Sequence, residues 1–486
     1  MKISKFIDLL QSTGEYETKK ISTALNGIVK RDKELHFTTD SRDIRENSVF
    51  IAIKGENTNG HNFVNDCFAK GAVISIVEEY GDFNGFCIKT ENCIAFINAM
   101  ASAYYSEIKP YTIALTGSNG KTSTKEWINS LLQCSFKKEE LFCNPGNKNS
   151  EIGLPVGLLN GMNEKKKIAV LEMGMAKEGD INYLRNTYPP DFSIILNIGT
   201  AHIGNTGSLE NTFLEKSQII VKGKPLLLNI SDRLLSQHFN SLKQEKDIYL
   251  FGLYEDAPLS RMGIFLKDFR YTLSNDNHYT TIVSIVIQNP EKGITFEKNL
   301  RIKGIYHRGF LLNLCAAFTT VYAIQNNLAF LEKIPDVISP VKGRFTFKEI
   351  NHNLIIDDFY NSSIESLEFA LETIHKLIEN THYGEVICIL GSIAETGIYS
   401  KQIHEKIGSL LEQYKINEVI MYTKNKDIEL LSKHFNRQKF YSDNRRIIAS
   451  EIIRHIKQTE KGIYLFKASR SIQLEEVYEN VLESFS

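Results

Sequence analysis

The segment TIALTGSNGKTSTKEWINSLL constrains the fold of this chain more than any other part of its sequence. An apolar run ends at Leu115, a turn with two glycines follows, and a helical pattern begins near Lys121. A short apolar run before a glycine turn indicates a buried strand, and a buried strand that leads into a helix is typical of parallel sheets. The segment therefore predicts an α/β fold with a phosphate-binding loop at the carboxyl end of a strand.

The residue types in this turn suit a nucleoside triphosphate. Gly117 and Gly120 let the backbone approach phosphate oxygens and point N–H groups at them, and the helix N-terminus adds a favourable dipole. We expect Lys121 to reach the β- and γ-phosphates and Thr122 to hold magnesium. The pattern G-x-x-x-x-G-K-[ST] is incomplete, because Leu115 occupies its first glycine position. A chance Gly-Lys pair is the alternative, and the agreement of strand, turn, lysine, hydroxyl and helix argues against it.

Alternating strand and helix patterns divide the 486 residues into three parts. Residues 1–108 predict a small mixed α/β domain, and residues 109–337 predict a parallel sheet covered by helices on both faces. Residues 260–302 break this rhythm and indicate an antiparallel edge or a small β insertion. Residues 338–486 resume the alternation and predict a smaller, doubly wound, Rossmann-like domain. We expect a nucleotide and a second substrate to bind in a cleft between α/β domains.

Charge and hydropathy exclude several classes of partner. The 57 basic and 58 acidic residues give a net charge of −1, so we expect neither nucleic acid nor a membrane as a partner. No apolar run approaches the ~18 residues of a membrane span, and the start MKISKFIDLLQ predicts an amphipathic helix rather than a signal peptide. None of the seven cysteines forms a C-x-x-C pair, which indicates reduced thiols in a cytoplasmic protein.

Three side chains downstream of the loop are candidates for a magnesium site. Glu172 ends the apolar run IAVLE, and His202 follows the run SIILNIGTA. The carboxyl ends of parallel strands share one edge of a sheet, so both side chains are expected beside Lys121. A histidine alone in a loop is more often a surface or capping residue. Because Glu172 and Lys121 are expected beside it, we interpret His202 as a metal ligand instead. Lys216 lies in a predicted helix, where a lysine is usually a solvated charge.

Motifs along nearly the whole chain resemble the Mur ligases, the ATP-dependent amide ligases of peptidoglycan assembly. The first domain contributes TTDSR (38–42), FIAIKG (50–55) and NGHNF (59–63). The central domain contributes TGSNGKT (116–122), GNKNSEIGLP (146–155), EMG (172–174), NIGTAH (197–202) and GS (207–208). The last domain contributes PVKGR (340–344), IDDFYN (356–361), LGSIAETG (390–397) and KASRS (467–471). This order resembles most the branch that adds D-alanyl-D-alanine to UDP-N-acetylmuramoyl-tripeptide.

The resemblance implies roles for residues at matching positions. The residues implied to hold ATP are Gly117, Ser118, Asn119, Gly120, Lys121, Thr122, Ser123, Asn313, Arg344, Asp358 and Asn361. Those implied to contact the UDP-sugar peptide or the incoming amino acid are Ser41, Arg42, Lys54, Asn149, Glu151, Glu395, Lys467, Ser469 and Arg470. The implied catalytic set is Lys121, His202, Lys216 and Arg344, and the implied magnesium ligands are Thr122, Glu172, His202 and Lys216. The family carries a carbamylated lysine at the position of Lys216, and carbamylation turns an ammonium into an anion.

The expected activity follows from the poor reactivity of a carboxylate toward an amine. Transfer of the γ-phosphoryl group of ATP gives an acyl phosphate with a good leaving group, and the amine then displaces phosphate. The resemblance implies that the carboxylate belongs to UDP-N-acetylmuramoyl-tripeptide and the amine to D-alanyl-D-alanine. It implies ATP and Mg²⁺ as cofactors, a three-domain fold and a cytoplasmic monomer.

Several departures from the family pattern keep alternatives open. The family has an H-N-x-x-N stretch that contacts adenine, whereas GIYHRGFLLNLCAA aligns only Asn313 and displaces His307 and Arg308 by two positions. A catalytically lapsed Mur-like binding protein is one alternative, and the retained Lys121 and Glu172 argue against it. Another is a Mur-type ligase for a different peptide or amino acid. The folate-type ligases resemble only the later domains, and IDDFYN favours the D-alanyl-D-alanine type over the tripeptide-forming enzyme.

Overall fold

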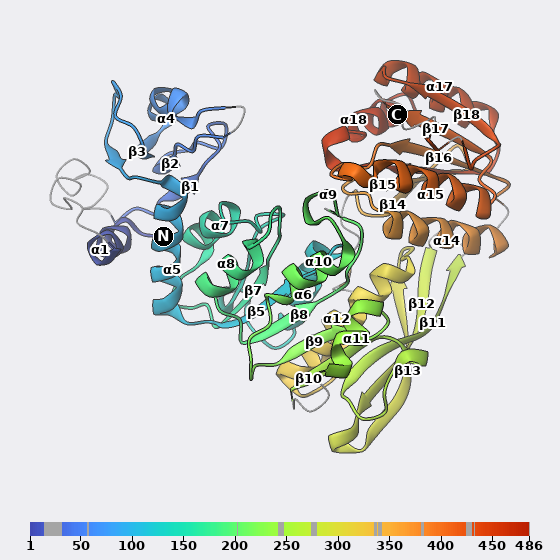
Figure 1. Cartoon of the computed structure of the whole chain (residues 1–486), viewed down its shortest axis with the longest axis horizontal. Coiled ribbons are helices and arrows are strands. Elements are labelled where there is room, and N and C mark those ends of the chain that lie inside the picture. The colour runs from blue at the N-terminus through green and yellow to red at the C-terminus, as the bar shows by residue number, and fades with distance from the viewer. Residues whose placement is uncertain are drawn as a thin grey trace.

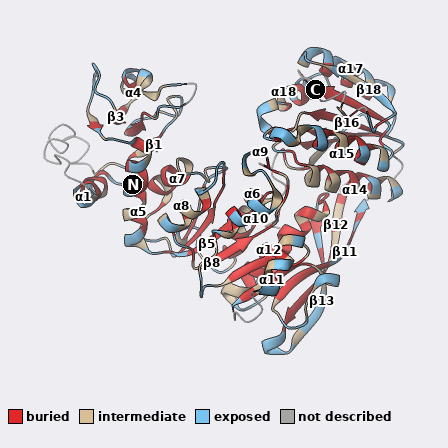
Figure 2. Ribbon diagram, in the orientation of Figure 1, coloured by how far each residue is buried: buried red, intermediate tan, exposed pale blue. Residues whose placement is uncertain are grey.

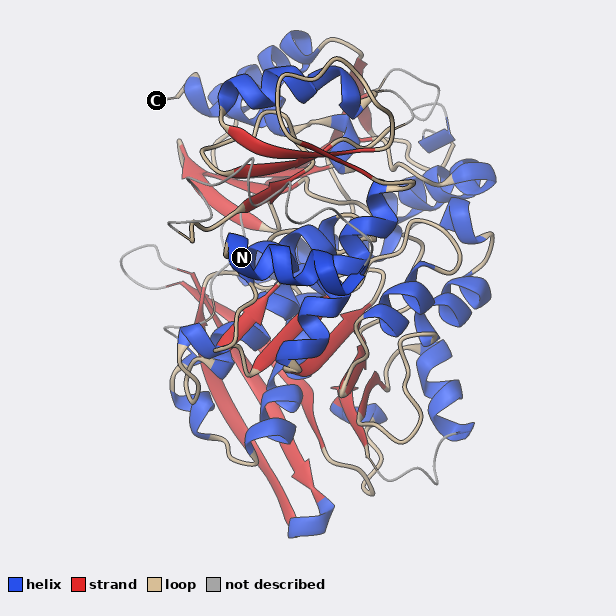
Figure 3. Ribbon diagram, turned by 90° about the vertical axis from the view of Figure 1, so that its left-hand side faces the viewer, coloured by secondary structure: helices blue, strands red, loops and turns tan. Residues whose placement is uncertain are grey.

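The computed structural model describes residues 1–13, 32–55, 58–201, 203–241, 247–273, 279–334, 338, 343–380, 383–423, 430–431 and 433–485. Three sheets follow one another along the chain, and the first and last lie on opposite sides of the central one (Figure 1). Figure 3 shows the sheets as layers between helices. No described helix is both long and apolar enough to cross a lipid bilayer.

The first sheet has four parallel strands in chain order, β1 (His36–Thr38), β2 (Ser48–Ile51), β3 (Ala72–Val77) and β4 (Cys87–Lys89). The 3-10 turn η1 (Gly60–Phe63) leads into helix α4 (Val64–Lys70). Helix α4 ends at Gly71, whose φ of 115° is a conformation that glycine adopts without steric cost. Helix α1 (Ile3–Thr13) packs on helix α5 (Cys93–Ile108), which leads into the central domain.

The central sheet has nine strands in the order β13-β12-β11-β10-β9-β8-β5-β7-β6. The parallel strands are β5 (Tyr111–Thr116), β6 (Leu141–Cys143), β7 (Ile168–Glu172), β8 (Phe192–Ile195), β9 (Leu226–Asn229), β10 (Ile248–Leu253) and β11 (Gly263–Leu273). Strands β12 (Tyr279–Asn289) and β13 (Ile294–Lys303) then run antiparallel. The helices are α6 (Lys121–Leu132), α7 (Gly153–Gly161), α8 (Asp180–Thr187), α9 (Ile203–Thr206), α10 (Leu209–Ser217), α11 (Arg233–Ser241) and α12 (Arg308–Gln325).

Strand β5 lies at the point where the order of the central sheet reverses. From β5 the chain first builds β6 and β7 on one side, and then continues to β8 and β9 on the other. Loops that leave such a strand diverge to opposite sides and open a crevice at its carboxyl end. The topology therefore places the turn after β5 where open α/β sheets bind their ligands.

The last sheet has the order β14-β15-β19-β16-β17-β18. Strand β14 (Thr346–Ile350) is antiparallel to β15 (Asn353–Asp358). The parallel partners are β16 (Glu385–Gly391), β17 (Glu418–Tyr422), β18 (Gln438–Ser442) and β19 (Gly462–Lys467). Helices α14 (Ile364–Asn380), α15 (Ser400–Gln413), α17 (Arg445–Gln458) and α18 (Glu475–Glu483) cover the sheet (Figure 1).

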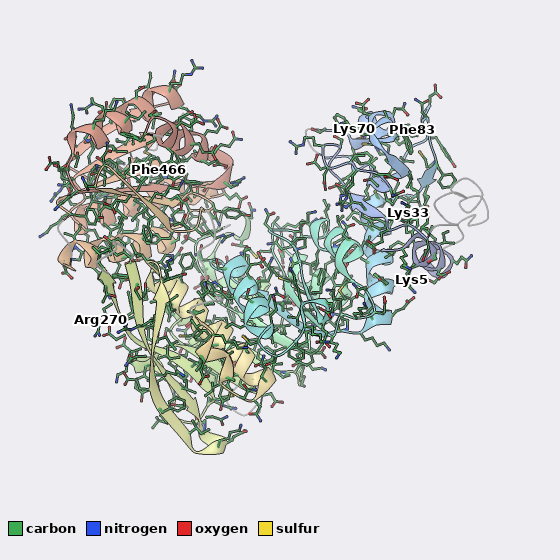
Figure 4. All side chains as sticks on the ribbon, turned by 180° about the vertical axis from the view of Figure 1, so that it is seen from behind. Lys5, Lys33, Lys70, Phe83, Arg270 and Phe466 are labelled. Atoms are coloured by element: carbon green, nitrogen blue, oxygen red, sulfur yellow. The ribbon has the colours of Figure 1, made fainter. Side chains whose placement is uncertain are left out.

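The strands of the central sheet are largely buried (Figure 2), and apolar cores on its two faces connect it to both neighbours. Strand β5 alternates between them: Ala114 belongs to a core shared with α5 and α7, whereas Ile113 and Leu115 belong to one shared with α12 and α14. Strands β11 to β13 also reach the last domain, where Tyr271 contacts Thr373 of α14 at 3.4 Å. Arg270, on the same strand, is exposed, and Phe466 lies inside the last sheet (Figure 4).

The predicted α/β class and the β insertion are confirmed. The apolar run that ends at Leu115 lies within β5, and the run IAVLE coincides with β7. Strand β18 was not predictable from hydropathy, because this edge strand, Gln438–Ser442, is largely exposed and polar. The boundaries at residues 108 and 337 remain a proposal.

Candidate active site

The turn after β5 is shaped by one glycine. Gly120 has a φ of 80°, which glycine tolerates and other residues rarely adopt, and it directly precedes the first turn of α6. A Cβ atom at this position would lie 1.9 Å from the Nδ2 atom of Asn313, on α12. Glycine is therefore required here both by conformation and by the close approach of Asn313.

The side chain of Lys121 folds back over this turn. Its Nζ atom donates a hydrogen bond to the carbonyl oxygen of Gly117 at 2.7 Å. Burial lowers the pKa of Lys121, while the nearby carboxylate of Glu172 opposes this change. The ammonium thus stands in the crevice next to a carboxylate, where it can reach an anionic ligand.

The end of β8 holds the turn in place. The Asn119 N–H donates to Asn197 Oδ1 at 2.8 Å, and Asn197 Nδ2 donates to the Asn119 carbonyl at 3.0 Å. The Ser118 hydroxyl donates to the carbonyl of Gly199 at 3.1 Å and accepts from its N–H at 2.8 Å. The backbone of the turn is fixed before any ligand binds, which lowers the entropy cost of binding.

Glu172 closes the crevice from the carboxyl end of β7. Its side chain is almost fully buried, and its Oε1 atom accepts a hydrogen bond from Asn149 Nδ2 at 2.6 Å. Its Oε2 atom is buried and has no hydrogen-bond partner among the described residues. The nearest cation is Lys125, whose Nζ atom is 3.7 Å away. A buried carboxylate oxygen without a hydrogen-bond partner is a hard oxygen donor of the kind that Mg²⁺ prefers, and Thr122, in the first turn of α6, lines the same cavity as Glu172. The described donor set therefore fits magnesium.

Lys216 is 1% exposed at the end of α10. Burial lowers its pKa well below the usual value, and the neighbouring charge of Lys121 lowers it further. The helical pattern alone predicted a solvated lysine on the surface at this position. The burial of Lys216 excludes that interpretation. His202, the other predicted metal ligand, lies outside the described residues.

The last domain brings further charge to the same crevice. The Arg344 guanidinium lies over the Tyr360 ring at 4.1 Å from its centre. Asp358 ends β15 and forms an ion pair with Lys467 of β19 at 2.5 Å. Burial raises the pKa of Asp358 to about 6, against the opposing charge of Lys467. The carboxyl edge of the last sheet thus faces the carboxyl edge of the central one.

Most of these groups line one cavity of about 480 Å³, whereas Lys216 and Lys467 are not among its lining residues. The predicted residues that line it are Ser118, Asn119, Gly120, Lys121, Thr122, Asn149, Glu172, Asn313, Arg344, Asp358 and Asn361. Other lining residues were not predicted, and they include Asn197, Asn229, Asp232, Tyr360 and Glu365. Asn197 and Asn229 end or follow apolar strands, so the carboxyl-edge rule that selected Glu172 could also have selected them.

Hydrogen bonds across the cavity join the two domains. Glu365 of α14 accepts from the Thr200 N–H at 2.9 Å and from its hydroxyl at 3.0 Å. Asn119 Nδ2 donates to the Ser363 hydroxyl at 3.1 Å. The cavity is consequently bounded by both domains rather than by the central one alone.

An aromatic stack forms another part of the cavity wall. The His307 ring lies 4.0 Å from the Phe310 ring and 5.7 Å from the Phe369 ring, nearly parallel to both. The Arg308 guanidinium covers Phe369 at 5.3 Å and pairs with Glu372 at 3.2 Å. Phe369 and Glu372 belong to α14, so the displaced His307 and Arg308 dock the last domain onto the central one.

The His307 ring also caps α12. Its Nδ1 atom accepts from the Phe310 N–H at 3.2 Å, and its burial lowers its pKa to about 3. A Cβ atom at Gly309 would lie 2.6 Å from the Phe369 ring, so this approach of α14 requires glycine. The segment that departs from the family pattern is therefore an ordered interdomain contact.

The remaining predicted residues lie apart from the cavity. Ser41, Arg42 and Lys54 belong to the N-terminal domain, where Arg42 pairs with Asp40 at 2.8 Å and lowers the pKa of that carboxyl to about 2. Gly117 and Ser123 do not line the cavity, and Ser123 is buried in α6. Glu151 accepts from Lys177 Nζ at 3.1 Å.

Three of the residues expected near the amino acid have partners within or beside the last domain. Ser469 accepts from the Ala394 N–H at 2.9 Å, and Arg470 pairs with Glu475 at 2.9 Å. The Glu395 carbonyl accepts from the Gly204 N–H at 2.9 Å, which adds another link to the central domain. None of these three residues lines the cavity.

Sequence comparisons match all three parts of the chain to one family. Residues 35–109 match the catalytic domain of the Mur ligase family, residues 115–321 the Mur ligase middle domain, and residues 343–470 the Mur ligase glutamate ligase domain. The UDP-N-acetylmuramoyl-tripeptide–D-alanyl-D-alanine ligase of Bacillus subtilis is 29% identical over 464 residues, with 92% of this chain and 93% of that protein covered. The Haemophilus influenzae ligase of the same name is 27% identical, with 90% and 92% covered.

Solved structures agree with this similarity. The MurF ligase from Thermotoga maritima in complex with ADP superposes with a TM-score of 0.77 at 26% identity, over 93% of this chain and 98% of that one. A crystal structure of MurF from Acinetobacter baumannii, at 24% identity, shares the fold with a TM-score of 0.78, over 92% and 93% of the two chains.

Proposed function

Because this chain belongs to the Mur ligase family, we propose that it uses ATP to join D-alanyl-D-alanine to UDP-N-acetylmuramoyl-tripeptide in peptidoglycan precursor synthesis. The observation that carries the proposal is the single cavity in which Lys121, Glu172 and the last-domain residues Arg344 and Asp358 meet. The two curated relatives named for this reaction support the choice of substrates, since each aligns with nine-tenths or more of this chain.

The first step is phosphoryl transfer to the tripeptide carboxylate. A carboxylate oxygen attacks the γ-phosphorus of ATP, the bond to the bridging oxygen breaks, and ADP leaves with an acyl phosphate in place. Such a transfer depends on positioning and on neutralisation of charge more than on covalent help. Lys121 and Arg344 supply positive charge, and the backbone N–H groups of the turn before α6 point at the phosphates.

Magnesium, when bound, would supply positive charge that offsets the negative charge of the phosphate oxygens. We propose Thr122 and Glu172 as its protein ligands, together with His202 and Lys216. The Lys216 role requires carbamylation, and a buried amine with a lowered pKa supports it because only the neutral amine adds carbon dioxide. The resulting carbamate is an anion with two oxygen donors.

In the second step the amine of D-alanyl-D-alanine attacks the acyl carbon. The tetrahedral intermediate then expels phosphate, and the amine loses a proton as the amide forms. Enclosure by the last domain protects the acyl phosphate from water. We propose Glu395, Lys467, Ser469 and Arg470 for the amino-acid side, Asn149 and Glu151 for the cleft, and Ser41, Arg42 and Lys54 for the UDP-sugar.

We further propose that residues 1–108, 109–337 and 338–486 are the functional domains of a cytoplasmic monomer. Both proposed substrates are water-soluble, so the reaction needs neither a membrane nor a nucleic acid. Light scattering on a sizing column with ATP present tests the monomer, and an apparent dimer mass contradicts it.

The reaction itself is tested by omission. Purified protein, ATP, Mg²⁺, UDP-N-acetylmuramoyl-tripeptide and D-alanyl-D-alanine are mixed, ADP is measured, and the pentapeptide is identified by mass spectrometry. We expect ADP and pentapeptide only when both substrates are present. ADP without pentapeptide would assign the same chemistry to other substrates, and no ADP under any condition would support the lapsed binding protein.

A further inference from the structure

A second lysine of α6, Lys125, is completely buried behind the cavity wall. Its side chain is 0% exposed, and it lies one helical turn after Lys121. A buried ammonium is costly unless its protons find acceptors. The Lys125 Nζ atom donates to the carbonyl oxygens of Asn144 at 2.5 Å and Gly146 at 2.8 Å.

These two bonds tie α6 to the segment 144–149, which in turn holds Glu172. Asn144 Oδ1 accepts from the Glu172 backbone N–H at 2.8 Å, and Asn149 Nδ2 donates to Glu172 Oε1 at 2.6 Å. The Gly174 N–H also donates to the Asn149 carbonyl at 2.8 Å. Lys125 is thus the only described side chain of α6 that donates to this segment.

The position of the ammonium leaves one carboxylate oxygen open. Lys125 Nζ lies 3.7 Å from Glu172 Oε2, which is too long for a hydrogen bond. Its two carbonyl partners hold it at that distance, together with Glu126, whose Oε1 atom lies 3.4 Å from Nζ. Lys125 therefore offers charge to Glu172 without a hydrogen bond to Oε2. The oxygen that remains without a hydrogen bond is buried, and Glu172 itself is one of the residues that line the cavity.

We infer that Lys125 is a positioning residue for cation binding, which fixes the 144–149 segment on α6 so that Glu172 Oε2 stays open as a metal ligand. This inference rests on the proposed function, because it takes Glu172 as a magnesium ligand. Groups that orient a metal ligand from behind typically change metal affinity by about 10- to 100-fold when they are removed.

The test uses Mn²⁺ as the probe, on the full chain with ADP present. Free Mn²⁺ is measured by electron paramagnetic resonance for the wild type, for Lys125→Met and for a matched control, Lys166→Met. Lys166 also donates to a backbone carbonyl, that of Leu141 at 2.8 Å, but it lies at the opposite end of the sheet from the cavity. We expect the Mn²⁺ dissociation constant of Lys125→Met to rise about 10-fold and that of Lys166→Met to stay within about twofold.

A second readout separates positioning from a general loss of structure. ADP affinity in the presence of a chelator should be the same for Lys125→Met and the wild type, because the phosphate turn itself is intact. A parallel loss of ADP and Mn²⁺ affinity would indicate structural damage and overturn the inference. If Lys125→Met does not fold, Lys125→Gln takes its place with the same expected result.

The inference and the proposed function fail in different ways. A wild type that binds Mn²⁺ and makes the pentapeptide, beside a Lys125→Met protein with equal or tighter Mn²⁺ binding, would overturn the inference alone. A wild type that binds no Mn²⁺ with ADP would contradict the metal site of the proposed function and the role of Lys125 with it.

Discussion

The wall of the cavity is built in two ways in two regions. Around the phosphate turn, the groups come from consecutive residues of β5, the turn and α6, and the residues after β8 that hold the turn belong to the same domain. Around His307, the groups come from α12 and α14, which belong to different domains and meet through aromatic rings. The turn can therefore be complete while the aromatic region depends on the position of the last domain relative to the central one. Substitutions in the two regions should therefore affect different steps.

Lys121→Ala should have the largest effect, because it removes a positive charge from the region where negative charge develops. Loss of one such group typically costs about 100- to 1,000-fold in kcat, and we expect at least that for ADP release. The Lys166→Met protein is the control and should keep its rate. Full ligase activity of Lys121→Ala would refute the phosphate role of the turn.

Lys216→Ala should come next, since it removes a buried group beside Lys121. We expect the rate to fall about 10- to 100-fold, as it does when a metal site loses one of its supporting groups. Wild-type activity in buffer freed of carbon dioxide should rise when bicarbonate is added, whereas Lys216→Ala should not respond. A wild type whose rate and carbon-13 spectrum are both indifferent to labelled bicarbonate would contradict carbamylation.

Phe369→Ala probes the aromatic region and should act mainly on binding. The ring contacts His307 and Arg308, and each lost aromatic or cation–ring contact is worth about 1 kcal/mol. We expect the KM for ATP to rise about 10-fold while kcat changes little, because roughly 1.4 kcal/mol corresponds to tenfold. Phe296→Ala, at an exposed position of β13, is the matched control. A fall in kcat equal to that of Lys121→Ala would erase the distinction between the regions.

His307→Asn should have the smallest effect on activity, since asparagine keeps an acceptor for the helix cap. Its effect is on pH dependence. The pKa of His307 is lowered to about 3, so the unfolded chain gains a proton near pH 6.5 that the folded chain does not take. His307 therefore contributes to the free energy of unfolding above pH 6.5, and this contribution is lost as pH falls toward 3.

For one such group, the free energy of unfolding falls by about 2 kcal/mol between pH 7 and pH 5. Urea unfolding at both values should show this difference in the wild type and a smaller one in His307→Asn. Equal pH dependence of the two proteins would mean that His307 takes up its proton in the folded state. Activity at pH 7.5 should stay within about threefold of wild type, in line with a solely structural change of about 0.6 kcal/mol.

The two regions also differ in how far the sequence predicts them. Gly120 and Lys121 were predictable because strand, turn and helix are adjacent in the chain and leave few arrangements. Glu172 was predictable because parallel strands align their carboxyl ends. The contact of Gly309 with Phe369 was not, because it joins residues that are distant in sequence and depends on domain placement. Lys125 was hidden for another reason: in sequence it resembles any helix lysine, and only its burial reveals it.

The core that α5 shares with α7 limits how domains of such chains can be exchanged between relatives. The N-terminal domain is also bound to α7 by two hydrogen bonds between Phe37 and Asn160, each of 2.8 Å, and Tyr104 of α5 donates to the Met162 carbonyl at 3.1 Å. A chimera that exchanges residues 1–108 for those of a relative would pack the relative's α5 against the α7 of this chain. The N-terminal domain therefore depends on its docking surface on α7, and an exchange of residues 1–108 should include α7 as well.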